Sequence, residues 1–116
     1  MGRVLIVDDD AHMSVMAALL ERMGHTAMHC MNGQDAIQQA EAFRPDVAFV
    51  DLAMPVMNGY NVAVELRKMC GDKLRLIAIS GLPSHLWQTS GALFERFLHK
   101  PVTSSTLIAL IGEVGK

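Results

Sequence analysis

The sequence predicts an α/β domain with a doubly wound, five-stranded parallel sheet. Short apolar runs alternate five times with segments whose apolar residues recur at helical spacing. The runs lack the period-two alternation of half-exposed strands, which indicates strands that are covered by helices on both faces. The length of 116 residues suggests a single domain over residues 1–116, either alone or excised from a larger protein.

Composition narrows the class of protein. Hydrophobic residues make up 51% of the chain, enough for a packed core, and the net charge of −2 gives no basic surface for direct nucleic-acid binding. Cys30 and Cys70 form neither a disulfide framework nor a metal cluster, which favours a reducing compartment. No apolar run approaches transmembrane length or the core of a signal peptide, so we expect a cytoplasmic protein without a membrane partner.

The first half of the chain should hold three strands and two helices. Val4–Val7 and Val47–Val50 are strongly apolar strands, and Thr26–Cys30 is a weaker one. Asp10 should cap the first helix and Gly24 should end it. The apolar face of that helix is Met16, Leu19, Leu20 and Met23.

The second helix follows a predicted cap at Asn32 and cannot continue through Pro45. Its apolar positions are Ala36, Ile37 and Ala40. A third helix is predicted from the spacing of Val62, Leu66 and Met69.

The last part of the chain should hold two more strands, at Leu74–Ile79 and Phe97–Leu98. A final amphipathic helix carries Leu107, Ile108, Ile111 and Val114, with Thr103, Ser104 or Ser105 as its cap. The least regular stretch is 81–96.

Polar side chains stand where four of the strands end. These are Asp8–Asp10, Asp51, Ser80–Gly81 and His99–Pro101. A parallel sheet brings its carboxyl ends to one edge, where ligands bind. Neighbouring carboxylates resist joint ionisation unless a cation is present, and hard oxygen ligands indicate Mg²⁺, or Mn²⁺ in its place. Asp51 can then stay charged after its apolar strand, because the metal and Lys100 share its pocket.

These motifs, taken in order, resemble the receiver domain of two-component response regulators. They are Val7-Asp8-Asp9, the run from Asp51 to Gly59, Ile79-Ser80-Gly81, and Lys100-Pro101. The resemblance covers nearly the whole chain, and the combination is specific although each motif alone is weak. It implies a flavodoxin-like strand order of 2-1-3-4-5 and a cis peptide bond before Pro101.

The resemblance also implies roles for the acidic residues. Asp51 would be the phosphoacceptor, which takes its phosphoryl group from the phosphohistidine of a sensor histidine kinase or phosphotransfer domain. Asp9 would bind Mg²⁺ directly and Asp8 through water, and the backbone carbonyl of Ala53 would be a further ligand. The isolated domain would catalyse its own phosphorylation and slow dephosphorylation without acting as a turnover enzyme.

Further residues take their roles from the same resemblance. Ser80 would hydrogen-bond a phosphoryl oxygen and Lys100 would pair with it. Phe97 stands where the family has an aromatic that moves on activation, which switches the face around the fourth helix and fifth strand. Pro55 and Gly59 would shape the loop after Asp51, with Gly59 able to take a positive φ. A homodimer and an unknown output partner or output domain stay open.

Two other functions compete with this interpretation. Asp8-x-Asp10, Ser80 and Lys100 also resemble a haloacid-dehalogenase-type phosphatase. That enzyme needs further acids late in the chain, and no aspartate follows Asp72. A pseudo-receiver, which binds partners without being phosphorylated, usually lacks an acid or the lysine, and none is missing here.

The segment between Ser80 and Lys100 departs from the family pattern, because it is shorter than is typical. Pro83 can start the fourth helix, but no glycine stands where that helix should end, so we expect it to be short or irregular. Trp87 in this segment is expected to be packed or half-exposed, with a binding role as the alternative.

The lifetime of the phosphoryl group should depend on the residues beside the path of an attacking water. The resemblance to receiver domains implies that the side chains two residues after the phosphoacceptor and two after the hydroxyl residue lie beside this path. Here these residues are Ala53 and Leu82. Neither offers a polar atom that could orient the water, so we expect slow self-dephosphorylation.

Overall fold

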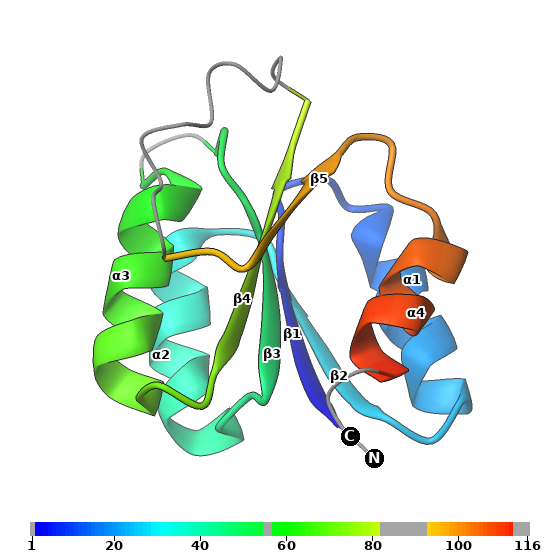
Figure 1. Ribbon diagram of the computed structural model, residues 1–116, viewed down its shortest axis with the longest axis horizontal. Helices are drawn as coiled ribbons and strands as arrows, with labels where there is room; N and C mark the ends of the chain where they lie inside the picture. Colours follow the sequence, from blue (N-terminus) through cyan, green and yellow to red (C-terminus); the bar gives the residue numbers. More distant parts are fainter. Residues whose placement is uncertain (1, 55–56, 82–92, 113–116) are drawn as a thin grey trace.

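The computed structural model describes residues 2–54, 57–81 and 93–112. The five strands in these ranges form one parallel sheet in the order β2-β1-β3-β4-β5, as expected (Figure 1). They are β1 (Arg3–Val7), β2 (Thr26–Cys30), β3 (Val47–Asp51), β4 (Arg75–Ser80) and β5 (Arg96–His99). The doubly wound α/β architecture is therefore confirmed.

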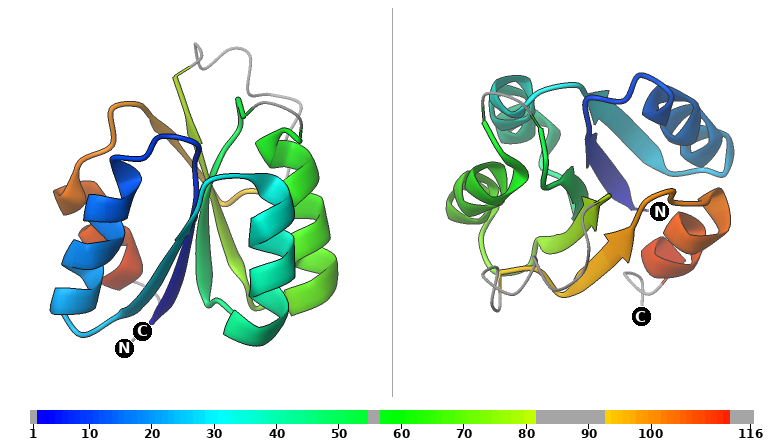
Figure 2. Two further views of the ribbon diagram at one scale, coloured as in Figure 1. Left: turned by 180° about the vertical axis from the view of Figure 1, so that it is seen from behind. Right: turned by 90° about the horizontal axis from the view of Figure 1, so that it is seen from above.

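The described helices cover both faces of the sheet. They are α1 (Met13–Arg22), α2 (Gly33–Phe43), α3 (Gly59–Cys70) and α4 (Ser104–Gly112). Helices α2 and α3 lie on one face, and α1 and α4 lie on the other (Figures 1 and 2). None of these helices combines the length and hydrophobicity that crossing a lipid bilayer requires.

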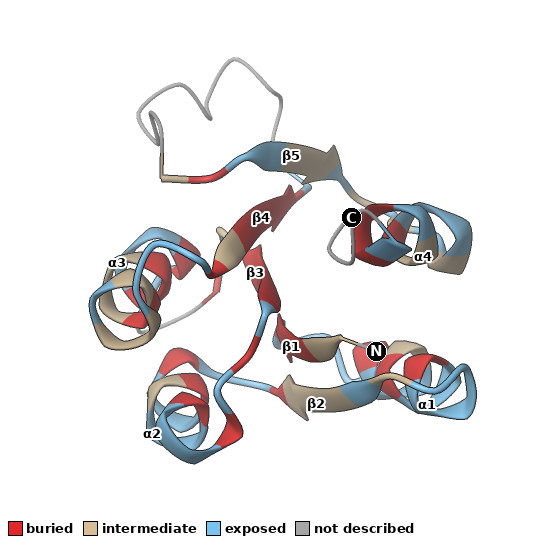
Figure 3. Cartoon of the chain, turned by 60° about the horizontal axis from the view of Figure 1, so that its bottom comes forward, coloured by how far each residue is buried: buried red, intermediate tan, exposed pale blue. Residues whose placement is uncertain are grey.

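Two hydrophobic cores result, one on each face of the sheet. Along β1, Leu5 and Val7 belong to the core under α2 and α3, whereas Val4 and Ile6 belong to the core under α1 and α4. The central strands β1, β3 and β4 are buried almost throughout, while the edge strands β2 and β5 are partly exposed (Figure 3). Burial on both faces explains why the central strands are continuously apolar in sequence.

Most of the predicted helix ends are observed. Asn32 caps α2, because its Oδ1 accepts the N–H of Asp35 at 2.8 Å. α2 ends at Phe43, two residues before Pro45. Gly24 follows the C-cap of α1 with a φ of 98°, a conformation that favours glycine.

The sequence offers three candidates for the cap of the last helix, Thr103, Ser104 and Ser105. The hydroxyl Oγ1 of Thr103 accepts the N–H of Thr106 at 3.2 Å, which makes Thr103 the cap of α4.

Two local predictions are wrong. Asp10 does not cap α1, which begins at Met13 with His12 as N-cap; instead, Oδ1 of Asp10 accepts the N–H of His12 at 2.9 Å in the preceding turn. Gly59 does not have a positive φ, because it is the first residue of α3. Glycine is needed there for space, since a Cβ would lie 2.0 Å from the backbone oxygen of Asp51.

Several predictions fall outside the described residues. They concern the helix predicted between Ser80 and Lys100, which is not α4, with its start at Pro83 and the side chains of Leu82 and Trp87. They also concern Pro55, and Val114 in the last helix. The cis peptide bond between Lys100 and Pro101 is present, as the resemblance implied.

Candidate functional site

The carboxyl ends of the strands converge at one edge of the sheet, and backbone hydrogen bonds hold the site residues there. The N–H of Asp8 donates to the carbonyl of Cys30 at 3.1 Å, which continues the β1–β2 ladder past the end of β1. In the same way, the N–H of Lys100 donates to the carbonyl of Ser80 at 2.9 Å beyond β5. Asp51 is the last residue of β3 and Ser80 the last of β4. The main chain thus brings all four predicted residues to the same edge.

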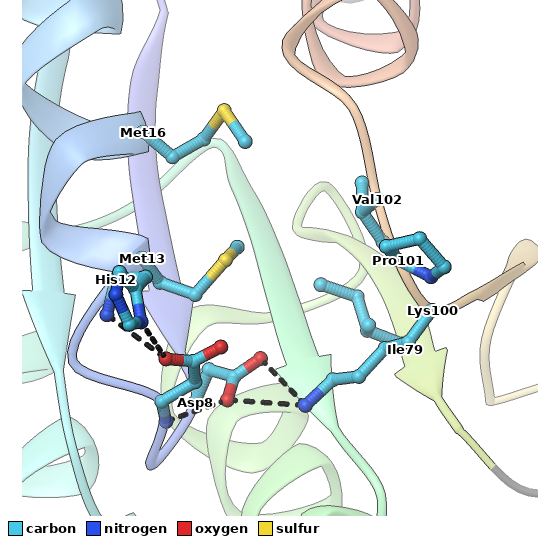
Figure 4. Close-up of a pocket in the computed structure, with 9 residues that line it drawn as sticks. Asp8, His12, Met13, Met16, Ile79, Lys100, Pro101 and Val102 are labelled. Atoms are coloured by element: carbon cyan, nitrogen blue, oxygen red, sulfur yellow. Dashed lines mark hydrogen bonds and ion pairs between the residues drawn. The ribbon is translucent and has the colours of Figure 1, made fainter.

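Lys100 links the two buried carboxylates. Its Nζ lies 3.1 Å from Oδ2 of Asp51. The same Nζ lies 3.3 Å and 3.2 Å from Oδ1 and Oδ2 of Asp8 (Figure 4). Asp8 is 0% exposed and Asp51 2%, whereas the Lys100 side chain is 31% exposed. The cation therefore reaches inward from a partly open position to two carboxylates that are almost entirely buried.

Backbone amides satisfy one oxygen of each carboxylate. Oδ1 of Asp8 accepts the N–H of Asp10 at 2.9 Å, and Oδ1 of Asp51 accepts the N–H of Ala53 at 3.0 Å. Within the described ranges, Oδ2 of Asp8 is buried and accepts no hydrogen bond, although it lies 3.2 Å from the Lys100 ammonium. A buried carboxylate oxygen without a hydrogen bond is costly and indicates an additional ligand.

A third carboxylate completes a candidate metal site. Asp8, Asp9 and Asp51 each offer an oxygen, and these oxygens all lie within 4.8 Å of one another. Asp9 is exposed and opens the cluster to solvent. Three carboxylates and one ammonium leave two negative charges, and the ligands are all hard oxygens. The cluster therefore fits a hard divalent cation such as Mg²⁺.

The charges of the site shift the proton affinities of two groups. Burial, together with the charge of Asp51, raises the pKa of Asp8, although the N–H of Asp10 and the Lys100 ammonium act against this change. For Lys100, burial lowers the pKa, but the hydrogen bond and charge of Asp51 and the charge of Asp8 outweigh it and leave the pKa raised. Lys100 thus stays charged, whereas burial makes ionisation of Asp8 less favourable because the carboxylate loses its hydration.

The proposed hydroxyl and aromatic residues lie on neighbouring strands, Ser80 at the end of β4 and Phe97 on β5. Ser80 is buried, with 1% of its surface exposed. Phe97 is half-buried on β5 and packs edge-on against Phe94, with ring centroids 5.7 Å apart. Ala53 is exposed, and its backbone N–H is the donor to Oδ1 of Asp51.

This arrangement can now be compared with known proteins. A sequence model described as the response regulator receiver domain matches residues 4–112. The chain belongs to the response regulator receiver domain family. As a receiver domain, it is 32% identical to the protein PilH of Pseudomonas aeruginosa over 120 residues and 29% identical to the chemotaxis protein CheY of Thermotoga maritima over 117 residues; each match covers 98% of both chains.

The fold of the receiver domain is also found among solved structures. The chemotaxis protein CheY4 of Vibrio cholerae matches with a TM-score of 0.86 and 25% identity, over 98% of both chains. The chain is therefore a receiver domain of the response regulator type in both sequence and fold.

A pocket of about 200 Å³ lies beside the charged cluster of this receiver domain. Met13 and Met16 on α1 line one side, and Pro101 and Val102, which precede α4, line the other (Figure 4). Lys100 belongs to the same pocket. The pocket therefore gives access to Lys100 between α1 and the segment that leads to α4.

One contact of the site was not expected from sequence. His29 of β2 is half-buried, and its Nε2 lies 2.8 Å from the backbone carbonyl oxygen of Asp8. The histidines lack metal-ligand spacing, and His29 stood out in no motif. The available signal was its place near the end of β2, the strand predicted to lie beside β1 and its acids.

Proposed function

We propose that this receiver domain accepts a phosphoryl group on Asp51 from the phosphohistidine of a sensor histidine kinase or phosphotransfer domain. The observation that carries this proposal is the placement of Asp51, buried at the end of β3 with Lys100 Nζ 3.1 Å from its Oδ2. Residues 1–116 would act as one receiver domain, alone or within a larger protein.

The transfer follows from the chemistry of the two partners. A carboxylate oxygen of Asp51 forms a bond to phosphorus while the bond between phosphorus and the imidazole nitrogen of the donor breaks. The electron pair of that bond stays on the imidazole. The product is an aspartyl phosphate, and the donor histidine is regenerated.

The residues around Asp51 supply positioning and charge rather than covalent help. The N–H of Ala53 and the Lys100 ammonium each hold one oxygen of Asp51 and so fix the orientation of the nucleophile. Lys100 can then pair with the oxygens of the transferred group, and the buried hydroxyl of Ser80 can hydrogen-bond one of them. These interactions strengthen as charge develops on the transferring group.

Asp9 would bind Mg²⁺, or Mn²⁺, directly, and Asp51 and the carbonyl of Ala53 would complete its protein ligands. Asp8 would bind through water, consistent with its Oδ2 that lacks a hydrogen bond within the described part of the chain. The metal would neutralise negative charge on the phosphoryl oxygens.

Intact-mass measurement tests the nucleophile. Purified chain incubated with acetyl phosphate and Mg²⁺ should gain one phosphoryl group, and Asp51→Asn should gain none. Asp9→Ala should lose most Mg²⁺ binding in a calorimetric titration, because it removes the direct ligand. Full labelling of Asp51→Asn would show that another residue is the nucleophile.

Phosphorylation should also switch the β5 side of the domain. Ser80 would move toward the phosphoryl oxygen and allow Phe97 to turn inward, which couples the site to an output surface. Phe97 has no hydroxyl, so its inward state gains packing only. Beryllofluoride, which mimics the phosphoryl group, should therefore shift the resonances of Phe97; unchanged resonances would refute this coupling.

A further inference from the structure

We propose that His29 is a positioning residue for the metal site, an inference that rests on the proposed function. It holds the peptide group between Asp8 and Asp9, the two acidic residues that follow β1. The geometry shows the contact directly, because Nε2 of His29 lies 2.8 Å from the carbonyl oxygen of Asp8 across two neighbouring strands.

The direction of this hydrogen bond follows from the acceptor. A backbone carbonyl oxygen accepts but cannot donate, so Nε2 of His29 must carry the proton. The contact is half-buried and therefore sheltered from competing water. His29 thus donates a fixed hydrogen bond to the backbone of Asp8.

The β1–β2 ladder ends where this contact occurs. Val7 pairs with Cys30, and the N–H of Asp8 donates to the carbonyl of Cys30. In a regular parallel ladder, the carbonyl of Asp8 would next accept the N–H of residue 32. Strand β2 ends at Cys30, however, and Asn32 is the N-cap of α2. Among the hydrogen bonds of the described residues, His29 supplies the donor that the ladder does not.

This hydrogen bond matters most for Asp9. The Asp9 carboxylate is exposed and makes no side-chain hydrogen bond within the described ranges, yet its oxygen lies within 4.8 Å of those of Asp8 and Asp51. Its position therefore depends on the backbone that carries it. The carbonyl that His29 holds belongs to the same peptide group as the N–H of Asp9, so His29 fixes the direction in which Asp9 leaves the strand.

The test compares Mg²⁺ affinities of the full chain by calorimetry. His29→Leu keeps similar bulk but removes the donor, and it should weaken Mg²⁺ binding roughly tenfold, as loss of an outer-shell partner does. His29→Gln should bind close to wild type, because its amide nitrogen can take the place of Nε2. His29→Asn, whose amide is shorter, should bind as weakly as His29→Leu and replaces it if that variant does not fold.

His25→Leu is the matched control. His25 is also half-buried, but it immediately precedes the first residue of β2, far along the strand from the site. Its Nδ1 accepts the N–H of Gly2 at 3.3 Å. This variant should keep wild-type Mg²⁺ affinity. The amide resonance of Asp9 gives a second measurement, which should broaden or shift in His29→Leu and return toward wild type in His29→Gln.

The outcomes separate this inference from the proposed function. If wild type binds Mg²⁺ and His29→Leu and His29→Asn bind it equally well, His29 has only a structural role and the inference is overturned. If wild type itself binds no Mg²⁺, the metal site of the proposed function fails and the inference fails with it.

Discussion

The acidic and basic sides of the site are built on different parts of the sheet. Asp8 and Asp51 extend from β1 and β3, central strands whose side chains are almost entirely buried, and both carboxylates are closed to solvent. Lys100 follows β5, an edge strand with exposed and half-buried positions, and keeps 31% of its side chain exposed.

The carboxylates that repel each other and the ammonium that neutralises them therefore come from different parts of the sheet. The two carboxylates are fixed in the packed centre and cannot move apart. Their protein-borne counter-charge comes from the edge of the sheet, where fewer contacts restrict movement. We infer that the centre sets the geometry of the reaction, while the edge responds to changes of charge.

Gly59→Ala should cause the largest loss of stability, because it disturbs the central strand β3 at Asp51. The new Cβ would lie 2.0 Å from the backbone oxygen of Asp51, and the closest atoms are all backbone atoms that cannot move aside cheaply. We expect a loss of about 3 kcal/mol or more in the free energy of unfolding by urea, together with reduced phosphorylation. Gly112→Ala is the control, since its Cβ would meet no atom within 4 Å. Equal stability of the two variants would contradict the close approach.

Lys100→Met should be next in size and tests the edge. It leaves Asp8 and Asp51 buried without their ammonium, and the partial exposure of Lys100 reduces the cost to about 2 kcal/mol in metal-free buffer. Mg²⁺ should then stabilise this variant more than wild type, because it supplies the missing charge. Lys68→Met, at an exposed lysine that lies 3.7 Å from Glu65, should change little. A metal-free Lys100→Met chain as stable as wild type would disprove the charge argument.

Asp8→Asn should stabilise the metal-free chain, whereas Lys100→Met destabilises it. The folded state raises the pKa of Asp8, so it binds the proton more tightly than the unfolded chain does, and wild-type stability should fall as pH rises from about 4 through the folded pKa. Asn avoids this loss and should stabilise the metal-free chain near pH 7 by roughly 1 kcal/mol.

Thermal unfolding in a metal chelator, measured from pH 4 to pH 8, tests this prediction. The advantage of Asp8→Asn should be small at pH 4 and grow with pH. Asp72→Asn, at an exposed position, is the control for the loss of a surface carboxylate. A constant difference at all pH values would mean that packing, rather than ionisation, causes the effect.

Ala53→Asn should have the smallest effect, and it should change the rate at which the phosphorylated chain loses its phosphoryl group. Ala53 is exposed and its methyl group cannot orient a water behind the phosphorus, whereas an amide can. Release of phosphate from purified phosphorylated chain should accelerate about fivefold, well below the effect of a full general base. Ala53→Val should decay like wild type. If Ala53→Asn also decays at the wild-type rate, the side chain at this position does not limit hydrolysis.

The fold was predictable because its strands are buried on both faces. Val47–Val50 is apolar without alternation, and so is the predicted strand Leu74–Ile79 after its Arg75; this pattern is typical of the central strands of a covered parallel sheet. The convergence of Asp8, Asp51 and Lys100 then follows from the topology, since parallel strands end at one edge. Their assignment as reactive groups came from the family resemblance.

The missed features depend on distances that the sequence does not contain. The need for Gly59 comes from the approach of α3 to the backbone of Asp51, although turn chemistry predicts a positive φ instead. Asp10 has the right residue type for a cap, but the turn before α1 moves the helix start to Met13. His29 donates to the main-chain carbonyl of Asp8, the residue after β1, and no side-chain motif reveals this contact.

The hydrogen bonds that place Asp8 and Lys100 join main-chain atoms, Asp8 to Cys30 and Lys100 to Ser80, and any amino acid other than proline can make them. A mutation at either position changes the chemical group presented at the edge of the sheet without removing the bond that locates it. Evolution and protein engineering can therefore change the reactive group at these positions one residue at a time and keep the main-chain bond that places it, although the loss or gain of charge still alters stability.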